Sequence, residues 1–253
     1  MGVLNKAYDQ HLKEEEHSSS PLAGGIMQNG YQCGMIWGAV LAAGAEVYRL
    51  FGSGPEAETR TIIAAQRLVK SFHDLNKNIN CFEITEIDKS STAMQMFVFF
   101  LIKGGTIGCF RKASKYAPVA FNEINSVLSE KYVEAPSAPV SCAAVLARKM
   151  GVSDLHAVMT SGFAGGIGLC GGACGALGAA IWINGMKNAS EQGSKVDFKD
   201  PKAVEIVDRF LKHTNYEFEC AKIVGRKFEN VGDHAEFIKN GGCDKLIDTL
   251  ARP

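Results

Sequence analysis

Eight cysteines are the side chains of this 253-residue chain that offer the most chemistry. Thiolates ligate soft metal ions and iron–sulfur clusters, and pairs of thiols exchange electrons by forming disulfides. The chain opens with a polar, acidic segment that lacks the apolar stretch of a secretory signal, so we expect a cytoplasmic protein. Because a reducing cytosol disfavours structural disulfides, the cysteines indicate metal ligation or redox chemistry. The alternative is that they are small buried apolar residues.

Six of the cysteines fall into two matching sets. Gly-Gly-Ile occurs at residues 24–26 and again at 165–167, each time at the same distance before a Cys-Gly pair. Such a repeat indicates two copies of one cysteine-bearing unit. The sets are Cys33, Cys81 and Cys109 in the first copy and Cys174, Cys220 and Cys243 in the second, which also holds Cys142 and Cys170.

The second copy supplies enough thiols for a four-sulfur site. Its candidate ligands are Cys142, Cys174, Cys220 and Cys243, a set that suits an iron–sulfur cluster or a structural zinc ion. Zinc sites usually contain close pairs of cysteines, and the chain has no C-x-x-C, which favours the cluster. The C-x-x-C-H signature of attached haem is also absent from the sequence.

The first copy supplies only three thiols, Cys33, Cys81 and Cys109. A complete four-ligand metal site there would need a further ligand, such as Cys170, a histidine or solvent. The six histidines are scattered without the spacing of metal ligands, so we expect surface or capping roles for them.

Two other functions remain open at this point. Cys170 and Cys174 could form a reversible disulfide if the backbone between them is not helical, which would make the protein a thiol-disulfide oxidoreductase. Asn29 stands at the place of Cys170 in the first copy, so Cys170 belongs to no repeated set. A helical protein rich in sulfur would also suit binding or storage of a thiophilic metal such as copper(I).

The elements that must position the cysteines are helices. Apolar residues recur at helical spacing almost throughout, and no segment alternates as a strand does, so the fold class predicted is all-α. Two tandem pseudo-repeats of the cysteine-bearing helical unit are expected to pack face to face. We divide the chain into an N-terminal arm at 1–20, a repeat at 21–131, a linker at 132–140 and a second repeat at 141–253.

Each shared cysteine stands where a loop or a glycine break enters a predicted helix. A helix N-terminus favours a thiolate over a thiol, so we expect lowered cysteine pKa values at these positions. Small residues follow on one helical face: Gly34, Gly38, Ala42 and Ala45 in the first copy, and Gly171, Gly175, Gly178 and Ala179 in the second. The uncharged stretch 160–186 is expected to be a helix buried by its neighbours, and Phe97, Phe99 and Phe100 are expected in the core.

The composition argues against several classes of partner. The 27 basic and 27 acidic residues cancel and form no long basic run, so no nucleic acid is expected. No phosphate-cradling loop or dinucleotide fingerprint occurs, so no nucleotide is expected either. The stretch 160–186 is rich in glycine and lacks flanking basic clusters, which argues against a membrane span. The partner expected is another redox protein; a homodimer, and whether the protein is an enzyme, stay open.

The widely spaced cysteines around a glycine-rich motif resemble the redox-active family described by a C, GCAxxG, C, C pattern. Cys142 in SCAAVL resembles the leading cysteine of that family, Cys174 in ACGALG the motif cysteine, and Cys220 and Cys243 the last two. The resemblance covers residues 138–252, with a degenerate copy over about 22–118. Split-Soret cytochromes look related to this family, and that relationship implies an iron–sulfur-type centre.

The motif departs from the pattern at several places. In the second copy Ala173 replaces the first Gly and Gly175 replaces the Ala. In the first copy, QCGMIW, the corresponding places hold Gln32, Gly34 and Trp37, and a leading cysteine is lacking. The expectation that follows is a cytoplasmic redox protein that binds an iron–sulfur cluster through Cys142, Cys174, Cys220 and Cys243 and transfers electrons.

Overall fold

A computed structural model describes residues 1–102, 104–192 and 200–252. In this part of the chain all regular structure is helical, and two isolated β-bridges are the only strand-like pairings. The all-α prediction is confirmed. The polar segment 187–200, whose composition predicts a joint between two helices, falls partly on 193–199, outside the described residues, and its first residues continue a helix to Gln192.

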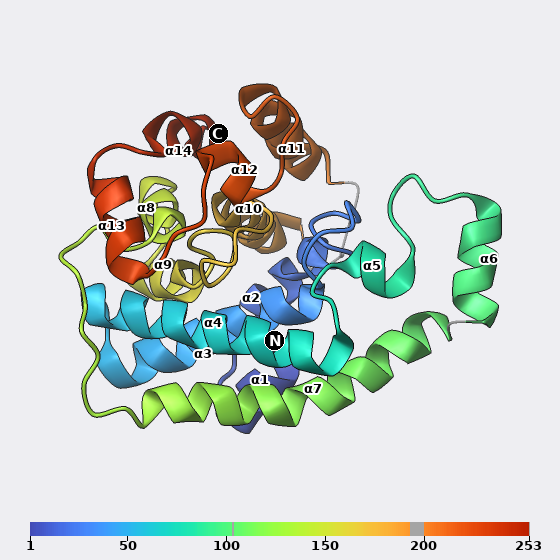
Figure 1. Cartoon of the computed structure of the whole chain (residues 1–253), viewed down its shortest axis with the longest axis horizontal. Coiled ribbons are helices and arrows are strands. Elements are labelled where there is room, and N and C mark those ends of the chain that lie inside the picture. The colour runs from blue at the N-terminus through green and yellow to red at the C-terminus, as the bar shows by residue number, and fades with distance from the viewer. Residues whose placement is uncertain (103, 193–199, 253) are drawn as a thin grey trace.

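The first half contains α1 (Gly2–Ala7), α2 (Lys13–Ser18), the short 3₁₀ helix η1 (Ser20–Leu22), α3 (Gly34–Phe51), α4 (Pro55–Asn76), α5 (Cys81–Thr85), α6 (Ala93–Leu101) and α7 (Gly105–Leu128). The second half contains α8 (Cys142–Lys149), α9 (Asp154–Ser161), α10 (Gly175–Gln192), α11 (Pro201–His213), α12 (Cys220–Val224), α13 (Val231–Lys239) and α14 (Asp244–Ala251). Figure 1 shows α3, α4 and α7 on one side of the molecule and α8, α11, α12 and α14 on the other.

The helices repeat in the same order in both halves. Counted from the start of each half, α2 corresponds to α9 and α3 corresponds to α10. A short helix that begins at a cysteine then follows in each half, α5 in the first and α12 in the second. The longer helices α4 and α11 both begin with proline in the first turn, a position where its missing N–H costs nothing. The two pseudo-repeats predicted from the cysteine spacing are therefore confirmed.

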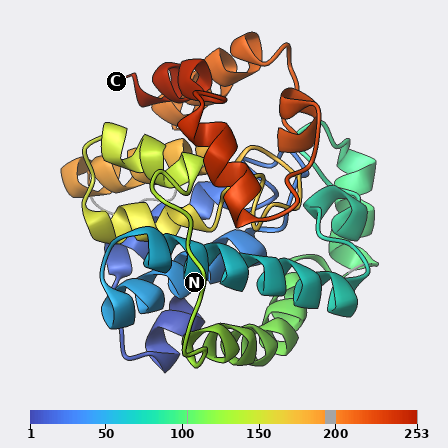
Figure 2. The same ribbon diagram turned by 60° about the vertical axis from the view of Figure 1, so that its left-hand side comes forward.

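The two repeats exchange contacts in a reciprocal way. Helix α3 of the first repeat packs on α9 of the second (Figure 2), and α10 of the second packs on α2 of the first. At the first crossing, a Cβ on Gly44 would lie 2.5 Å from Cα of Met159, and at the second, a Cβ on Gly185 would lie 3.2 Å from Cβ of Ser18. Equivalent positions thus make equivalent contacts, as they do around an approximate twofold axis.

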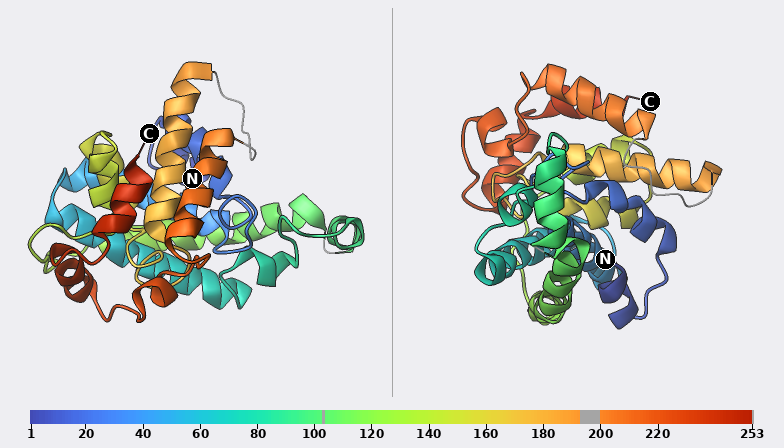
Figure 3. Two further views of the ribbon diagram at one scale, coloured as in Figure 1. Left: turned by 90° about the horizontal axis from the view of Figure 1, so that it is seen from above. Right: turned by 90° about the vertical axis from the view of Figure 1, so that its right-hand side faces the viewer.

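One apolar core runs through both repeats. The fully buried Trp37 of α3 and Trp182 of α10 belong to the same cluster, together with side chains from α4, α8, α9, α11 and α14. Figure 3 shows α10 running between the other helices of both halves. Burial of this much apolar surface favours the packed arrangement of the repeats.

The expected helix over 160–186 is wrong in its first half. Helix α9 ends at Ser161, residues 162–174 form a loop, and α10 begins at Gly175. Within the loop, residues 165–169 all have positive φ, between +55° and +79°, which makes a left-handed turn. Gly171 therefore lies in a loop and not on a helical face. The first repeat has the same turn at residues 24–28, and we call the segments 23–33 and 162–174 the glycine loops.

Helix α6 contradicts the prediction that Phe97 and Phe100 are core residues. No residue of α6 is buried, and Phe97 and Phe100 are 57% and 51% exposed, while Phe99 is half-buried. Among the described residues, no single helix is both long and apolar enough to cross a membrane. The bent pair α6 and α7 meets that test together by length and composition.

The crossing of α3 and α9 leads to a prediction about stability. Gly44→Ala places a methyl group against the backbone of Met159, and overpacking of this kind costs about 1–3 kcal/mol. Gly232→Ala in α13 is the matched control because only Asn230 Oδ1, at 3.2 Å, comes near its Cβ, and alanine favours a helix. Urea unfolding should show a clearly lower free energy of unfolding for Gly44→Ala and no decrease for Gly232→Ala. Equal stabilities would contradict the close crossing.

Candidate functional site

Cys174 and Cys220 are held side by side by the backbone. Ala173 and Glu219 form an isolated antiparallel bridge, and the cysteines follow these two residues directly. The N–H of Cys174 donates to the carbonyl oxygen of Phe218 at 2.8 Å, and the N–H of Cys220 donates to that of Gly172 at 2.6 Å. These backbone hydrogen bonds hold Cys174 and Cys220 next to each other, although the two residues lie 46 positions apart in the sequence.

The first repeat builds the same clamp. Gln32 and Asn80 form the bridge, and Cys33 and Cys81 follow them. The N–H of Cys33 donates to the carbonyl oxygen of Ile79 at 2.8 Å, and that of Cys81 donates to Tyr31 at 2.6 Å. The correspondence of the two cysteine pairs, first seen as spacing, is therefore a correspondence of local structure.

Six of the cysteines stand at helix N-termini, as predicted. Cys142, Cys81 and Cys220 are the first residues of α8, α5 and α12; Cys33 and Cys243 cap α3 and α14; and Cys174 directly precedes α10. Cys109 does not begin a helix. It is the fifth residue of α7, because the glycine pair begins this helix: Gly104 is its N-cap and Gly105 its first residue.

The four predicted ligands of the second repeat lie in one region of the interior. Cys142, Cys174 and Cys220 are buried and Cys243 is half-buried. Beyond the effect of burial, negative charge on Cys174, Cys142 and Cys243 raises the pKa of Cys220, which places all four thiols within reach of one another's charge. Cys170 acts on Cys220 more weakly.

The three thiols of the first repeat form a second group. Charges on Cys81 and Cys109 raise the pKa of Cys33, and a charge on Cys109 raises that of Cys81. All three are half-buried, so this group is more open than the one in the second repeat. Helix α7 thus returns Cys109 to the clamp of Cys33 and Cys81.

The expected lowering of the cysteine pKa values is wrong. Burial raises the pKa of Cys33 and of Cys142 to about 12, and it raises the pKa of Cys174, Cys220 and Cys243 as well. The helix N-termini do contribute in the expected direction, since the N–H groups of Ala176 and Leu177 point at Sγ of Cys174 and favour its thiolate. Desolvation outweighs them, so the thiols are neutral at pH 7.

The two groups differ in their counter-charges. Lys112 favours the thiolates of Cys33 and Cys109, and Lys227 favours that of Cys170. No cationic side chain of the described residues favours the thiolates of Cys142, Cys174, Cys220 or Cys243. These four thiols can ionise together only if a bound cation or cluster supplies the positive charge.

Gln32 ties the two groups together, and the sequence did not mark it as a site residue. Its fully buried amide donates from Nε2 to the carbonyl oxygen of Gly166 at 3.0 Å and accepts at Oε1 from the N–H of Ala173 at 3.0 Å. Gln32 precedes Cys33 as Ala173 precedes Cys174, so equivalent positions meet. The sign of this role in the sequence was that Gln32 stands where the family motif has its first glycine.

A second pair of equivalent positions meets in the same way. The ring of Trp37 packs on Gly178, where an added Cβ would lie 2.3 Å from the ring. Trp37 also donates from Nε1 to the carbonyl oxygen of Gln32 at 3.0 Å. Two of the departures of the first copy from the family pattern, Gln32 and Trp37, therefore each face a small residue of the second copy, Ala173 or Gly178.

Cys170 has a local structural role. It is a free thiol whose Sγ lies 2.7 Å from the carbonyl oxygen of Gly166 and donates to it. In the first repeat Asn29 bonds its own loop in the same manner, donating from Nδ2 to Ile26 at 2.8 Å. The backbone between Cys170 and Cys174 is not helical, which was the condition for a disulfide between them, and both are free thiols.

The histidine prediction is wrong for His234. This side chain is buried and its Nδ1 lies 2.9 Å from the carbonyl oxygen of Val140, two residues before Cys142. Burial lowers its pKa, so it is neutral at pH 7. It packs edge-on against Phe228, with ring centroids 4.7 Å apart.

No group of three Cys, His, Asp or Glu side chains within the described ranges is close enough to hold a single metal ion. A tetrahedral zinc ion, with Zn–S bonds of about 2.3 Å, needs its thiolates roughly 4 Å apart. The present arrangement of the thiols does not meet that requirement. An iron–sulfur cluster is several atoms across, and its thiolate ligands stand further apart.

A family model titled "Putative redox-active protein (C_GCAxxG_C_C)" matches residues 1–99 and 140–252. The chain belongs to this family. Each matched segment contains one glycine loop and one bridged pair of cysteines, which confirms the resemblance noted in the sequence and supports a redox role. Cys109 lies outside both segments, so its place beside Cys33 and Cys81 comes from the structure alone. No curated protein and no solved structure matches the chain.

The raised thiol pKa values predict how stability depends on pH in the reduced, metal-free protein. An unfolded thiol loses its proton near pH 8.5, whereas Cys33 and Cys142 keep theirs to about 12 in the folded state. The folded state then binds more protons, so stability falls as pH rises from about 8.5 toward 12. Each such thiol contributes up to about 1.4 kcal/mol per pH unit.

Urea unfolding of the wild-type protein at pH 7, 8, 9 and 10 tests this expectation. Cys142→Ala is the informative variant because it removes one of the titrating thiols. Above pH 9 its free energy of unfolding should fall less steeply with pH than that of the wild type, by the contribution of one proton, whatever its stability at pH 7. Stability that stays level from pH 8 to pH 10 would contradict the raised pKa values.

Proposed function

We propose that this family member is an electron-transfer protein of the cytoplasm whose second repeat binds an iron–sulfur cluster through Cys142, Cys174, Cys220 and Cys243. One observation carries the proposal. Four thiols from four separate helix N-termini gather in one region, and among the described residues no cationic side chain is a leading influence on their pKa values. Buried groups of this kind require an external positive centre when they ionise.

The donor set fits a cluster better than a single ion. All four side chains are thiols, which are the usual ligands of iron–sulfur clusters. Among the described residues the four thiols do not form a site for a single metal ion as they stand, whereas a cluster offers several iron atoms to which separate thiolates can bind. The widely spaced positions in the sequence are no obstacle, because the bridge between Ala173 and Glu219 fixes two of them and the packing of α8 and α14 on each other and on α10 brings the others near.

A bound cluster would supply one-electron transfer, and the protein supplies the N–H groups and the buried surroundings of the sulfurs. The N–H groups of Ala176 and Leu177 direct partial positive charge at Sγ of Cys174, which stabilises negative charge on that sulfur. The N–H of Gly165 does the same for Cys142. Burial of Cys142, Cys174 and Cys220 excludes water from three of the four sulfurs, while the half-buried Cys243 marks the side nearest to solvent.

The first repeat is proposed as a second, incomplete metal site. Cys33, Cys81 and Cys109 reproduce the clamp and add a third thiol, but Met1 of α1 stands where Cys142 stands in α8. Cys170, considered as a fourth ligand, lies with the other repeat, where its charge reaches Cys220. The half-buried thiols leave solvent as the remaining ligand.

The dithiol alternative has less support. Cys170 is engaged with the carbonyl oxygen of Gly166, and its place is taken by Asn29 in the first repeat without loss of the loop geometry. Because asparagine can take its place in the first repeat, we assign Cys170 a role in stabilising the loop. We therefore keep thiol-disulfide exchange between Cys170 and Cys174 as the outcome that the following experiment can reveal.

Anaerobic reconstitution with iron and sulfide tests the proposal. The wild-type protein should gain broad visible absorption that bleaches with dithionite, together with bound iron and acid-labile sulfide. Cys142→Ser, Cys174→Ser, Cys220→Ser and Cys243→Ser should each lose most of that absorption, because a buried hydroxyl is a poor substitute for a thiolate ligand. Cys170→Asn, which copies the first repeat, is the matched control and should keep it.

Two outcomes would contradict the proposal. A colourless protein without iron whose free thiols fall by two per chain under mild oxidation, in wild type but not in Cys170→Asn, would establish the dithiol function. Uptake of several copper(I) ions per chain without sulfide, by a protein that takes no iron, would establish metal storage.

A further inference from the structure

Helix α6 is the most exposed apolar element among the described residues. It carries no charge, none of its residues is buried, and it packs on α7 alone among the main helix contacts. Met94, Phe97 and Leu101 are 70%, 57% and 68% exposed, at the spacing i, i+3, i+7 that forms one face of a helix. A helix that is apolar on all sides is normally covered, so this one lacks a partner in the single chain.

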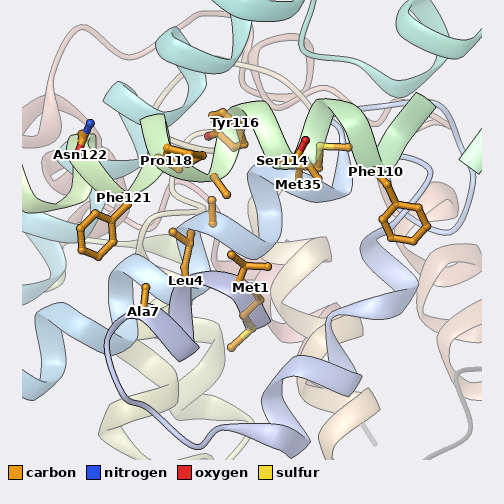
Figure 4. Close-up of a pocket in the computed structure, with 15 residues that line it drawn as sticks. Met1, Leu4, Ala7, Met35, Phe110, Ser114, Tyr116, Pro118, Phe121 and Asn122 are labelled. Carbon is orange, nitrogen blue, oxygen red and sulfur yellow. The ribbon is translucent and has the colours of Figure 1, made fainter. Parts of the chain in front are cut away.

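The same chain has an apolar groove on its surface. It has a volume of ≈ 700 Å³ and lies between α1, α3 and α7. Figure 4 shows Met1, Leu4 and Ala7 on one side of the groove and Phe121 of α7 on the other, with Met35 of α3 beside Ser114 of α7. The hydroxyl of Tyr116 is already engaged, since it donates to the carbonyl oxygen of Leu68 at 2.9 Å. The groove therefore presents mainly hydrocarbon.

The exposed helix and the groove are parts of one continuous surface along α7. Ile107, 62% exposed, and Phe110, 74% exposed, connect them, and Phe110 also lines the groove. Helix α6 does not reach the groove of its own chain, because it lies beyond the N-terminal end of α7 (Figures 1 and 3). The arrangement offers a projecting apolar helix and an apolar groove side by side on each copy.

We propose that two copies of the chain associate by reciprocal exchange, with α6 of each copy seated in the groove of the other. A twofold axis beside Phe110 brings both helices into both grooves at once, which closes the assembly at a dimer. The occupant enters as an amphipathic ligand helix does, with Met94, Phe97 and Leu101 as anchors. Tandem thiol sites are then present in two copies per assembly.

The available area agrees with a stable dimer. The exposed apolar side chains are Met94, Phe97, Phe100, Leu101, Ile102, Ile107 and Phe110, each between 51% and 75% exposed. At roughly 200 Å² for a fully exposed large side chain, they present about 900 Å² per copy. A standard stable interface buries about 800 Å² per partner. The patch also exceeds what monomers usually leave exposed.

Two variants separate the two halves of the contact. Phe97→Asp places a charge on the α6 face, and Ala117→Trp fills the groove from α7. Sedimentation velocity should show a dimer for the wild-type protein at 10–100 µM protein, about the range where such complexes are assayed. Each variant should weaken dimerisation by about 30-fold or more, as loss of a central anchor does. Tyr132→Asp, at a residue 79% exposed outside the groove, is the matched control and should leave it unchanged.

Mixing the two variants tests the exchange itself. A heterodimer keeps one intact contact, with the α6 of the Ala117→Trp chain in the groove of the Phe97→Asp chain. The mixture should therefore associate at least tenfold more tightly than either variant alone. Circular dichroism and thermal melting check the fold, which Phe97→Asp should preserve because α6 has no buried residue.

Three results would overturn the proposal. The first is a wild-type protein that stays monomeric at 100 µM. The second is dimerisation that both variants weaken but their mixture does not restore, since this would indicate stacking of the patches without exchange. The third is a monomer that binds vesicles of phosphatidylglycerol and phosphatidylcholine through Phe97, which would assign the helix to a lipid surface.

Discussion

The contact between the two glycine loops is the constraint on which the rest of the structure depends. At this contact, position 32 meets position 173 and position 37 meets position 178, so the same places in the two repeats face each other. Two large side chains do not fit there, and the sequence resolves the conflict by pairing Gln32 with Ala173 and Trp37 with Gly178. The buried amide of Gln32 satisfies two backbone groups of the opposite loop, which would otherwise be costly to bury. The departures of the first copy from the family pattern are therefore complementary to the second copy.

The thiol groups follow from the same constraint. Each glycine loop turns through a left-handed segment, which L-residues avoid unless the surroundings enforce it, and delivers a cysteine to the start of a long helix. A Cβ on Gly25 would lie 2.2 Å from the backbone of Tyr31, so the turn and the approach of the chain to its bridge both require glycine. The bridge then adds the cysteine of a short helix, and the last thiol comes from a later element. Strain in the loops is thus balanced by the packing of the two repeats, and desolvation keeps the thiols neutral at pH 7.

Much of this organisation could be predicted from the sequence. Helical periodicity gave the fold class, the recurrence of Gly-Gly-Ile gave the two repeats, and the glycine breaks placed most cysteines at helix starts. The left-handed loop could not be predicted, because a run of small apolar residues suits both a helix and a tight turn, and only contacts with the other repeat decide between them. The thiol pKa values were missed for a related reason, since the helix N-terminus is visible in the sequence while the depth of burial is not. Phe97 was misplaced because nothing local in the sequence shows that α6 is left uncovered in the single chain, and Cys109 because α7 begins at Gly105, a residue type that usually ends a helix.

The central claim is that the four thiols of the second repeat share one sulfur-bridged centre. Iron K-edge X-ray absorption on the anaerobically loaded protein tests it most directly, because it reports the atoms around each iron. The account predicts iron surrounded by sulfur alone, with an iron–iron scattering component that disappears in Cys174→Ser and persists in Cys170→Asn. Iron bound through oxygen or nitrogen, or a spectrum that Cys174→Ser leaves unchanged, would contradict it.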